Sequence, residues 1–176
     1  MRDFQHPKLG QTLIELLVYA ALVVIIGGIV TTMLVAMQRA IAQTLVARRV
    51  QATAAVVLER IVRDARVAHD IDELASTLGV HPGRVTLLVR DEGGGPDVAY
   101  AFEAVASALE VRRNGVLEGS LTPDTVSVAN LVFREVVTPV SEALRIELTL
   151  HAEQGRASST EKFYVTTVLR DSYQLE

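Results

Sequence analysis

The feature that most constrains this chain is an apolar run near its N-terminus with a single carboxylate at its start. No charged residue occurs in the 22 positions from Leu16 to Met37, and Glu15 immediately precedes them. A helix of that length spans roughly 33 Å at about 1.5 Å per residue, enough to cross a hydrocarbon core of about 30 Å. The sequence therefore predicts a membrane-spanning helix with one acidic group at its entrance. A secretory signal peptide fits less well, because its apolar region is shorter and its small residues follow that region.

The carboxylate of Glu15 needs a partner, because an intramembrane charge costs about 2.5–3.5 kcal/mol at mid-bilayer, and less near an interface. No basic residue lies within one helical turn, since positions 11, 12, 18 and 19 hold Gln, Thr, Val and Tyr. We therefore expect the partner to come from another chain, or from a new amino terminus made by cleavage next to Gly10. The alternative is a side chain that extends to the headgroups.

Composition limits what the rest of the chain can be. Of the 176 residues, roughly a hundred remain beyond the predicted helix, which is enough for one small domain. The net charge of −4 argues against nucleic-acid binding as the main function. Cys is absent, so no disulfide supports the domain and the redox compartment is not indicated.

The helix is predicted to continue beyond the apolar run. Neither Pro nor Gly occurs between Gln38 and His69, and apolar residues recur there with the 3.6-residue period of an amphipathic helix. We expect one helix from Leu13 to Ala68, whose second half packs on a domain. The alternative is two helices with a break at Gly27-Gly28. The apolar stripe consists of Val50, Ala54, Val57, Leu58, Ile61, Ala65 and Ala68.

After Ala68 the pattern changes to that of strands. Asp70–Leu78 is predicted to form a helical turn or a short helix, capped by Asp70 or Asp72. Asn114-Gly115 is a strong type I′ hairpin signal. We expect five to seven strands, mostly antiparallel because their connections are short. The fold class is α+β: a long N-terminal helix packed on a small, mostly antiparallel β-sheet head. The strand-like runs are 85–90, 98–103, 109–113, a short run from 116, 126–133, 144–150 and 162–169.

The stretch GQTLIELLVYAALVVIIGGIV resembles the N-terminal signature of type IV pilins and pseudopilins: a short leader, a Gly before the cut, and a Thr-Leu-Ile-Glu-Leu start to a long apolar helix. Gln11 departs from the usual Phe. The resemblance implies a leader (residues 1–10), a transmembrane helix half (11–37), an amphipathic helix half (38–69) and a β-rich head (70–176).

The rest of the chain is similar to W-type minor pilins and J-type minor pseudopilins. The helical RRVQATAAVVLERIVRDARVAHD carries this likeness, together with the runs VAYAF, LEVRRNG, LTPDTVSVANLVF, LRIELTL and KFYVTTVLRDS. The likeness covers most of the chain as a general pattern of strands. It implies a minor subunit, located near the tip of a filament, where it helps to initiate assembly.

The resemblance also implies how individual residues act. A prepilin peptidase cuts between Gly10 and Gln11 and then methylates the amine of Gln11. Glu15 neutralises that amine in its own or a neighbouring subunit. The residues that pack between the helices of a filament are Thr12, Leu13, Ile14, Leu16 and Leu17.

The implied partners are other major and minor pilins or pseudopilins, the inner membrane, and an assembly platform with its ATPase. The chain is expected to cross the inner membrane once, with its N-terminus cytoplasmic and its head outside the cytoplasm. Nucleic acid would be a partner only in a DNA-uptake system, through residues such as Arg112-Arg113. Type IV pilus, type II secretion and competence systems all remain open.

Catalytic chemistry has few candidates in the sequence, and we expect neither an enzyme nor a cofactor. The chain lacks Cys and a G-x-S-x-G elbow. The run from His69 to Glu73 lacks the spacing of a zinc or EF-hand site. The carboxylates Asp91, Glu92 and Asp97 flank three glycines; we expect a hairpin loop there, with a weak Ca²⁺ site as the alternative, and no metal is expected. Two alternatives remain: a membrane-anchored β domain that binds or senses without polymerising, and a membrane-tethered enzyme.

Overall fold

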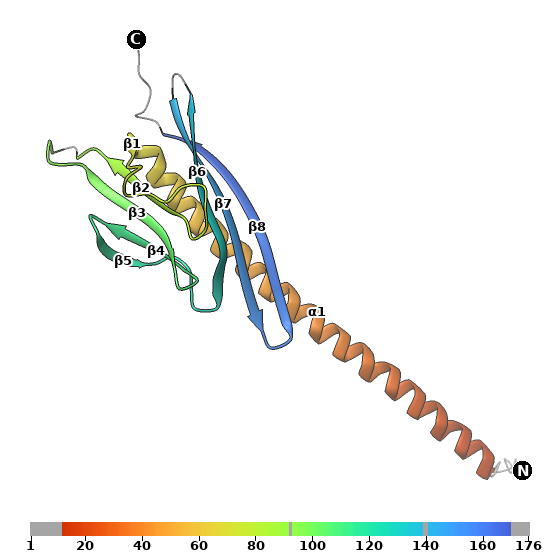
Figure 1. Ribbon diagram of the computed structural model, residues 1–176. Coiled ribbons are helices and arrows are strands. Elements are labelled where there is room, and N and C mark those ends of the chain that lie inside the picture. Colours follow the sequence, from red (N-terminus) through yellow and green to blue (C-terminus); the bar gives the residue numbers. More distant parts are fainter. Residues whose placement is uncertain (1–11, 92, 139–140, 170–176) are drawn as a thin grey trace, which may run out of the picture. The chain divides into compact units, whose positions relative to one another are not determined.

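The computed structural model describes residues 12–91, 93–138 and 141–169. One long helix is followed by strands only (Figure 1), which confirms the predicted α+β class. The elements in this part of the chain are α1 (Leu13–Val67), β1 (Asp70–Ile71), β2 (Arg84–Val89), β3 (Val98–Val105), β4 (Ala108–Arg113), β5 (Val116–Ser120), β6 (Val126–Thr138), β7 (Ser141–Gln154) and β8 (Ala157–Val168).

Helix α1 is uninterrupted from Leu13 to Val67, within one residue of the predicted end. It contains no Pro, so every residue beyond the first turn can donate its backbone N–H along the helix. The alternative of a break at Gly27-Gly28 is wrong. At this point the Thr31 hydroxyl donates to the Gly27 carbonyl at 2.8 Å, which gives that carbonyl a further donor within the helix.

The chain divides into two compact units between Ile41 and Ala42. In the first unit every described residue, from Thr12 to Ile41, is exposed. The second unit, from Ala42 onward, is called the head unit below. It contains the last part of α1 and all of the described strands.

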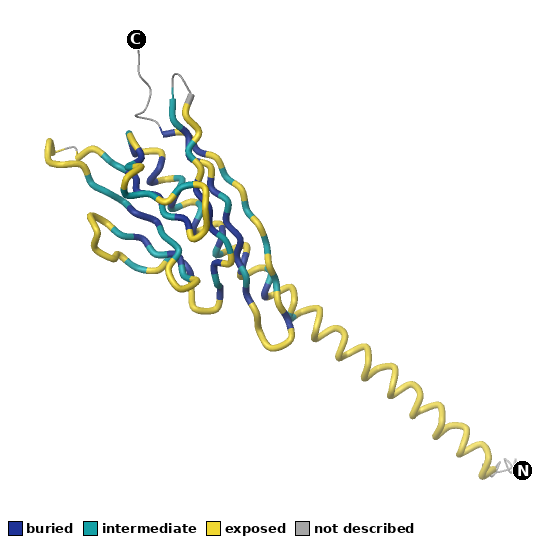
Figure 2. The backbone as a smooth tube through the Cα atoms, in the orientation of Figure 1, coloured by how far each residue is buried: buried dark blue, intermediate teal, exposed yellow. Residues whose placement is uncertain are grey.

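In the head unit one face of α1 is buried in a core that includes residues of both sheets (Figure 2). The predicted stripe is confirmed except for Leu58, which is half-buried, and it begins one turn earlier, at Val46. Full burial of a Val or Ile side chain contributes about 1.5–3 kcal/mol, so this stripe is a principal source of the head's stability. Its buried members are Val46, Val50, Ala54, Val57, Ile61, Ala65 and Ala68.

The strands form two sheets rather than one. The first has the order β1-β2-β3-β4-β5 and the second β6-β7-β8, with every neighbouring pair antiparallel. The predicted antiparallel pairing is confirmed, and the described residues contain eight strands rather than the predicted five to seven. After β5 the chain turns at Pro123 and enters β6 in the other sheet, and α1 packs against both (Figure 1).

Two local predictions concern turns, one at Asn114-Gly115 and one at Asp70–Leu78. Asn114 and Gly115 have φ of 50° and 80°, as the predicted type I′ hairpin requires. Of the two forms predicted for Asp70–Leu78, the short helix is wrong, because the first two residues form β1, which pairs with β2, and a single turn follows. Asp72 does act as a cap, because its Oδ1 accepts from the Ala75 N–H at 3.0 Å in a turn.

We predict that Phe133→Ala lowers the free energy of unfolding by about 3–5 kcal/mol, because this fully buried ring of β6 leaves a cavity in the core. Denaturant unfolding of the full chain in detergent micelles measures the loss. The control is Val137→Ala on the same strand, where the side chain is 66% exposed and the change should stay within about 0.5 kcal/mol. Equal losses in the two variants would contradict this assignment of the core.

Candidate functional site

The exposed apolar part of α1 is the first candidate site. Its large side chains are mostly more than half exposed, Leu13 at 80% and Met33 at 74%. Among the described residues α1 is the one helix long and apolar enough to cross a membrane, judged by length and composition. The predicted packing residues Leu13, Ile14, Leu16 and Leu17 all lie here and are exposed. Water is a poor solvent for such a surface, so this segment needs apolar surroundings.

Glu15 is the only acidic residue in this segment. It lies at the third helical position, and Thr12 caps the helix: the Glu15 N–H lies 3.0 Å from the Thr12 carbonyl oxygen and 3.4 Å from Thr12 Oγ1. The Tyr19 hydroxyl, one turn later, donates to Glu15 Oε1 at 3.3 Å. No basic group pairs with Glu15 in the described part of the chain.

These contacts give Thr12 a capping role besides its predicted packing role, and they add Tyr19, which had no predicted role. Thr12 and Glu15 have the Thr-x-x-Glu spacing of a capping box, and Tyr19 lies at the i+4 position from Glu15. Both signals are in the sequence, and Tyr19 gives the Glu15 carboxylate a hydrogen-bond donor on its own helix. Gly10 and Gln11, the residues of the predicted cleavage and methylation site, lie outside the described residues.

His69 and several of the carboxylates considered as metal ligands have other partners among the described residues. His69 Nε2 lies 3.3 Å from Asp97 Oδ2, so the structure joins one member of each candidate group. Asp70 Oδ1 accepts from the Ile71 N–H, and Asp91 Oδ2 from the Gly95 N–H. Within residues 12–91, 93–138 and 141–169, no three His, Asp or Glu side chains are arranged to hold a metal ion.

The Arg112-Arg113 pair is engaged within the five-stranded sheet. Arg112 hydrogen-bonds to Glu103 and, at 3.1 Å, to Glu110. The bond to Glu103 is the main reason that the pKa of the Arg112 guanidinium is raised. The Arg113 guanidinium carbon lies 5.8 Å from the centre of the Tyr100 ring. Neither residue matches a freely solvated arginine, and Arg112 already has two carboxylate partners.

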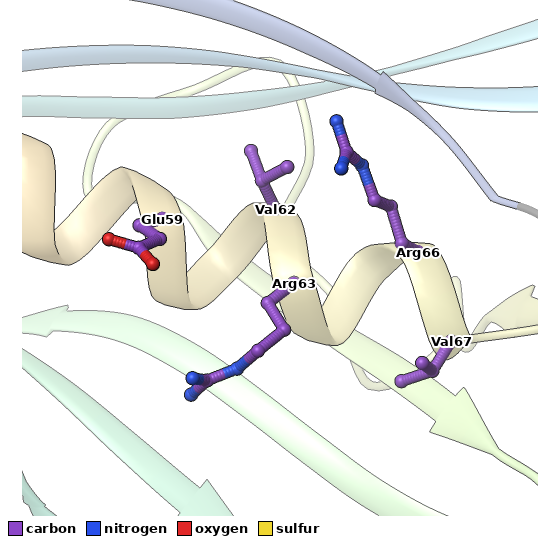
Figure 3. A pocket seen from close by; sticks show the side chains of 5 residues that line it. All are labelled: Glu59, Val62, Arg63, Arg66 and Val67. Carbon is purple, nitrogen blue, oxygen red and sulfur yellow. The ribbon is translucent and has the colours of Figure 1, made fainter.

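A shallow groove follows the exposed face of α1 in the head unit. Figure 3 shows Arg63 and Arg66 extending to opposite sides of the helix. A second hollow shares Glu59 and Arg63 and adds Val56, so the two are continuous along the helix. The groove offers apolar contact area bordered by a net positive charge. Its lining residues are Glu59, Val62, Arg63, Arg66 and Val67.

A polar link joins α1 to β5 beside this groove. Arg60 Nε lies 2.6 Å from Asp64 Oδ2, and Arg60 also reaches Glu118 at 3.2 Å. Asp64 is 9% exposed, so its charge requires this partner. The hydrogen bond to Asp64 raises the pKa of the Arg60 guanidinium. The charges of Arg60, Asp64 and Glu118 are thus paired with one another within the head unit.

Four carboxylates interact where β6 and β7 meet the segment after α1. Burial is the main cause of the raised pKa of Glu135, followed by the charges of Glu73, Glu142 and Asp70. The pKa of Glu142 is raised by burial and then by Asp70 and Glu73. Ionisation of Glu135 is therefore less favourable in the folded state than in the unfolded chain, and it destabilises the fold at neutral pH.

Comparison of the chain with protein-family models, with curated proteins and with solved structures gave no match.

We predict that Glu135→Gln increases the free energy of unfolding at pH 7. A raised folded-state pKa destabilises the fold fully above that pKa, and the penalty disappears as pH falls below the unfolded value of about 4.3. The stabilisation should therefore be present at pH 7 and absent near pH 4 in thermal unfolding. Glu153→Gln, at an exposed residue of β7, removes the same charge and serves as the control. Equal stabilisation by the two variants would attribute the effect to net charge alone.

Proposed function

We propose that this chain is a minor pilin or minor pseudopilin, a structural subunit of a type IV pilus or of a type II secretion pseudopilus. The observation that carries this proposal is Glu15, one carboxylate in an otherwise uncharged helix segment whose side chains are all exposed. The Gly-Gln-Thr-Leu-Ile-Glu-Leu sequence around it is the pattern that resembles the prepilin signature.

In this proposal the chain is a substrate and a building block and performs no catalysis. A prepilin peptidase removes residues 1–10, cuts between Gly10 and Gln11, and methylates the Gln11 amine. The apolar segment holds the subunit in the inner membrane, with the head outside the cytoplasm. An assembly platform with its ATPase then moves the subunit into a filament of other pilins or pseudopilins.

Glu15 has a physical role at the assembly step. An amine in an apolar bundle is strongly unfavourable without a counter-charge, and a methylated amine remains a cation. A Glu15 carboxylate paired with the Gln11 amine of its own or a neighbouring subunit removes both unpaired charges. A pair between subunits also fixes their axial register. Leu13, Ile14, Leu16 and Leu17, exposed in the single chain, supply packing area between helices.

The position in the filament is part of the same proposal. The likeness to W-type minor pilins and J-type minor pseudopilins favours the tip, where the subunit would help to initiate assembly. The basic, partly apolar groove around Arg63 and Arg66 is suited to lateral contact with an acidic neighbouring head.

One observation favours a second candidate function. Thr12 and Glu15 have the spacing of a capping box, and the Glu15 carboxylate accepts a hydrogen bond from the Tyr19 hydroxyl of the same helix, so its local contacts need no other subunit. On this alternative the chain is a bitopic membrane protein whose β head binds or senses and never polymerises.

Two substitutions at Glu15 distinguish these functions. Gln preserves the capping box but carries no charge, whereas Ala removes both. If charge pairing is the role, both variants should insert into the membrane normally and fall at least tenfold in the filament fraction, since an unpaired charge costs about 2.5–3.5 kcal/mol at mid-bilayer. The assay compares alkali-resistant membranes with sheared filaments from the host cell.

Glu153→Ala, which removes an exposed carboxylate of the head, is the matched control and should assemble normally. Wild-type amounts of Glu15→Gln in the filaments would show that capping suffices and would reject the charge-pairing role. Absence of the unaltered chain from every filament fraction would favour the bitopic alternative.

A further inference from the structure

The two sheets have four edges, and three of these are short, irregular or covered. β1 is two residues long. β5 is five residues long, and its pairing with β4 is interrupted by a register shift between Val111 and Arg112. Short and bulged edges resist pairing with other chains. The β8 edge shares neither property.

The β6 edge is long, but a loop covers it. The Gly79 N–H donates to the Phe133 carbonyl at 2.7 Å, and the Gly83 N–H to the Leu131 carbonyl at 3.0 Å. The Leu131 N–H in turn donates to His81 Nδ1 at 3.0 Å. A Cβ on Gly83 would lie 2.7 Å from the Leu131 carbonyl oxygen, so only Gly lets the loop approach this closely. The outward backbone groups of β6 are thus satisfied within the chain along this stretch.

β8 is the contrasting edge. It has 12 residues without Pro or Gly, and its register with β7 is unbroken from Gln154↔Ala157 to Ala143↔Val168. The hairpin has a two-residue loop that starts with Gly155 at φ 62°, so Gln154 and Ala157 form a hydrogen-bonded pair. Hydrogen-bonded pairs then recur at every second residue. The residues left with backbone groups at the open edge are Ser158, Thr160, Lys162, Tyr164, Thr166 and Val168.

No hydrogen bond to these outward backbone groups is found in the described part of the chain. The same six residues have exposed side chains, Tyr164 at 60%. An unbroken, twelve-residue edge with free donors and acceptors is a template for one more strand. In Figure 1 β8 is the outermost strand of its sheet.

The charges around β8 indicate what such a strand should carry. On the face of this sheet that points away from α1, Glu147 lies 3.3 Å from Arg134 and 3.5 Å from Arg145. Lys162 has no ion-pair partner among the described residues. It borders a small polar hollow that is also lined by Asn130, Thr149 and Glu147. The Glu147 carboxylate already has its two arginine partners, so the Lys162 ammonium is the charged donor that this edge offers to a carboxylate.

We propose that β8 binds an extended segment of a different polypeptide as a fourth, antiparallel strand, with an acidic side chain of that segment facing Lys162. Backbone hydrogen bonds to Thr160, Lys162, Tyr164 and Thr166 supply affinity, and the acidic residue fixes the register. This binding surface is separate from Glu15 and does not depend on whether the chain polymerises.

The test uses the full chain in detergent micelles and a fluorescently labelled synthetic peptide of about ten residues. The peptide alternates Thr and Val and has one Glu placed to face Lys162, and a second peptide has Lys at that position. Anisotropy titration should show saturable binding of the Glu peptide with roughly three- to tenfold preference over the Lys peptide. The variant Lys162→Glu should reverse that preference.

A backbone variant tests the strand itself. Thr166→Pro removes one outward N–H and leaves the bonds to β7, a change that edge strands tolerate. It should abolish binding of the Glu peptide, whereas Thr166→Ala should bind as the unaltered chain does. Circular dichroism checks that the variants are folded. If Thr166→Pro is unfolded, the charge reversal at Lys162 is the deciding test.

Three results would overturn the proposal: no saturable binding of either peptide, equal binding by Thr166→Pro and Thr166→Ala, or a preference that Lys162→Glu does not reverse. Self-association of the full chain that competes with the peptide and is lost in Thr166→Pro would assign the edge to a second copy of this chain and overturn the proposed partner.

Discussion

The architecture depends on one continuous helix, α1, whose last part is buried along one apolar stripe and whose first part is exposed on every side. Within the head unit the stripe on α1 is buried, from Val46 to Ala68, in one core with both sheets. The described residues before Ala42 are exposed on every side of the helix. The helix is continuous through Ile41, but its two parts bury their apolar side chains in different ways. From Val46 onward the apolar face is covered by side chains of the head. Before Ala42 the apolar side chains need apolar surroundings outside the chain.

The sequence predicted the fold where apolar residues repeat with a clear period or where a turn has a strong local signal. The stripe from Val50 to Ala68 predicted the end of α1 to within one residue. Asn114-Gly115 predicted the hairpin that joins β4 and β5. The division into two sheets was not predictable, because strands of either sheet alternate in the same way and only tertiary contacts with α1 assign them. The Ala106-Ser107 turn, with φ of 47° and 69°, uses residues that give no turn signal. β1 is held by its pairing with β2 and not by its own two residues.

The candidate sites also differ in whether the sequence alone could predict them. Glu15 was evident from sequence because a charge next to an apolar run is a local anomaly. Its contacts with Thr12 and Tyr19 follow from i+3 and i+4 spacing and were accessible but not assigned. The open edge of β8 could not be found in this way, because it depends on which strand lies beside β7 and on the loop that covers β6. The ion pair of Arg112 with Glu103 likewise depends on the register of β3 with β4, whereas Glu110 lies two residues before Arg112 on the same strand.

The account rests most directly on the state of the amino terminus, since the proposed partner of Glu15 does not exist until the leader is removed. The deciding measurement is mass spectrometry of the N-terminal peptide of the protein extracted from its host membrane. The account predicts a chain that starts at Gln11 and carries one added methyl group on its terminal amine. A protein that retains Met1 or Arg2 as its first residue would contradict it.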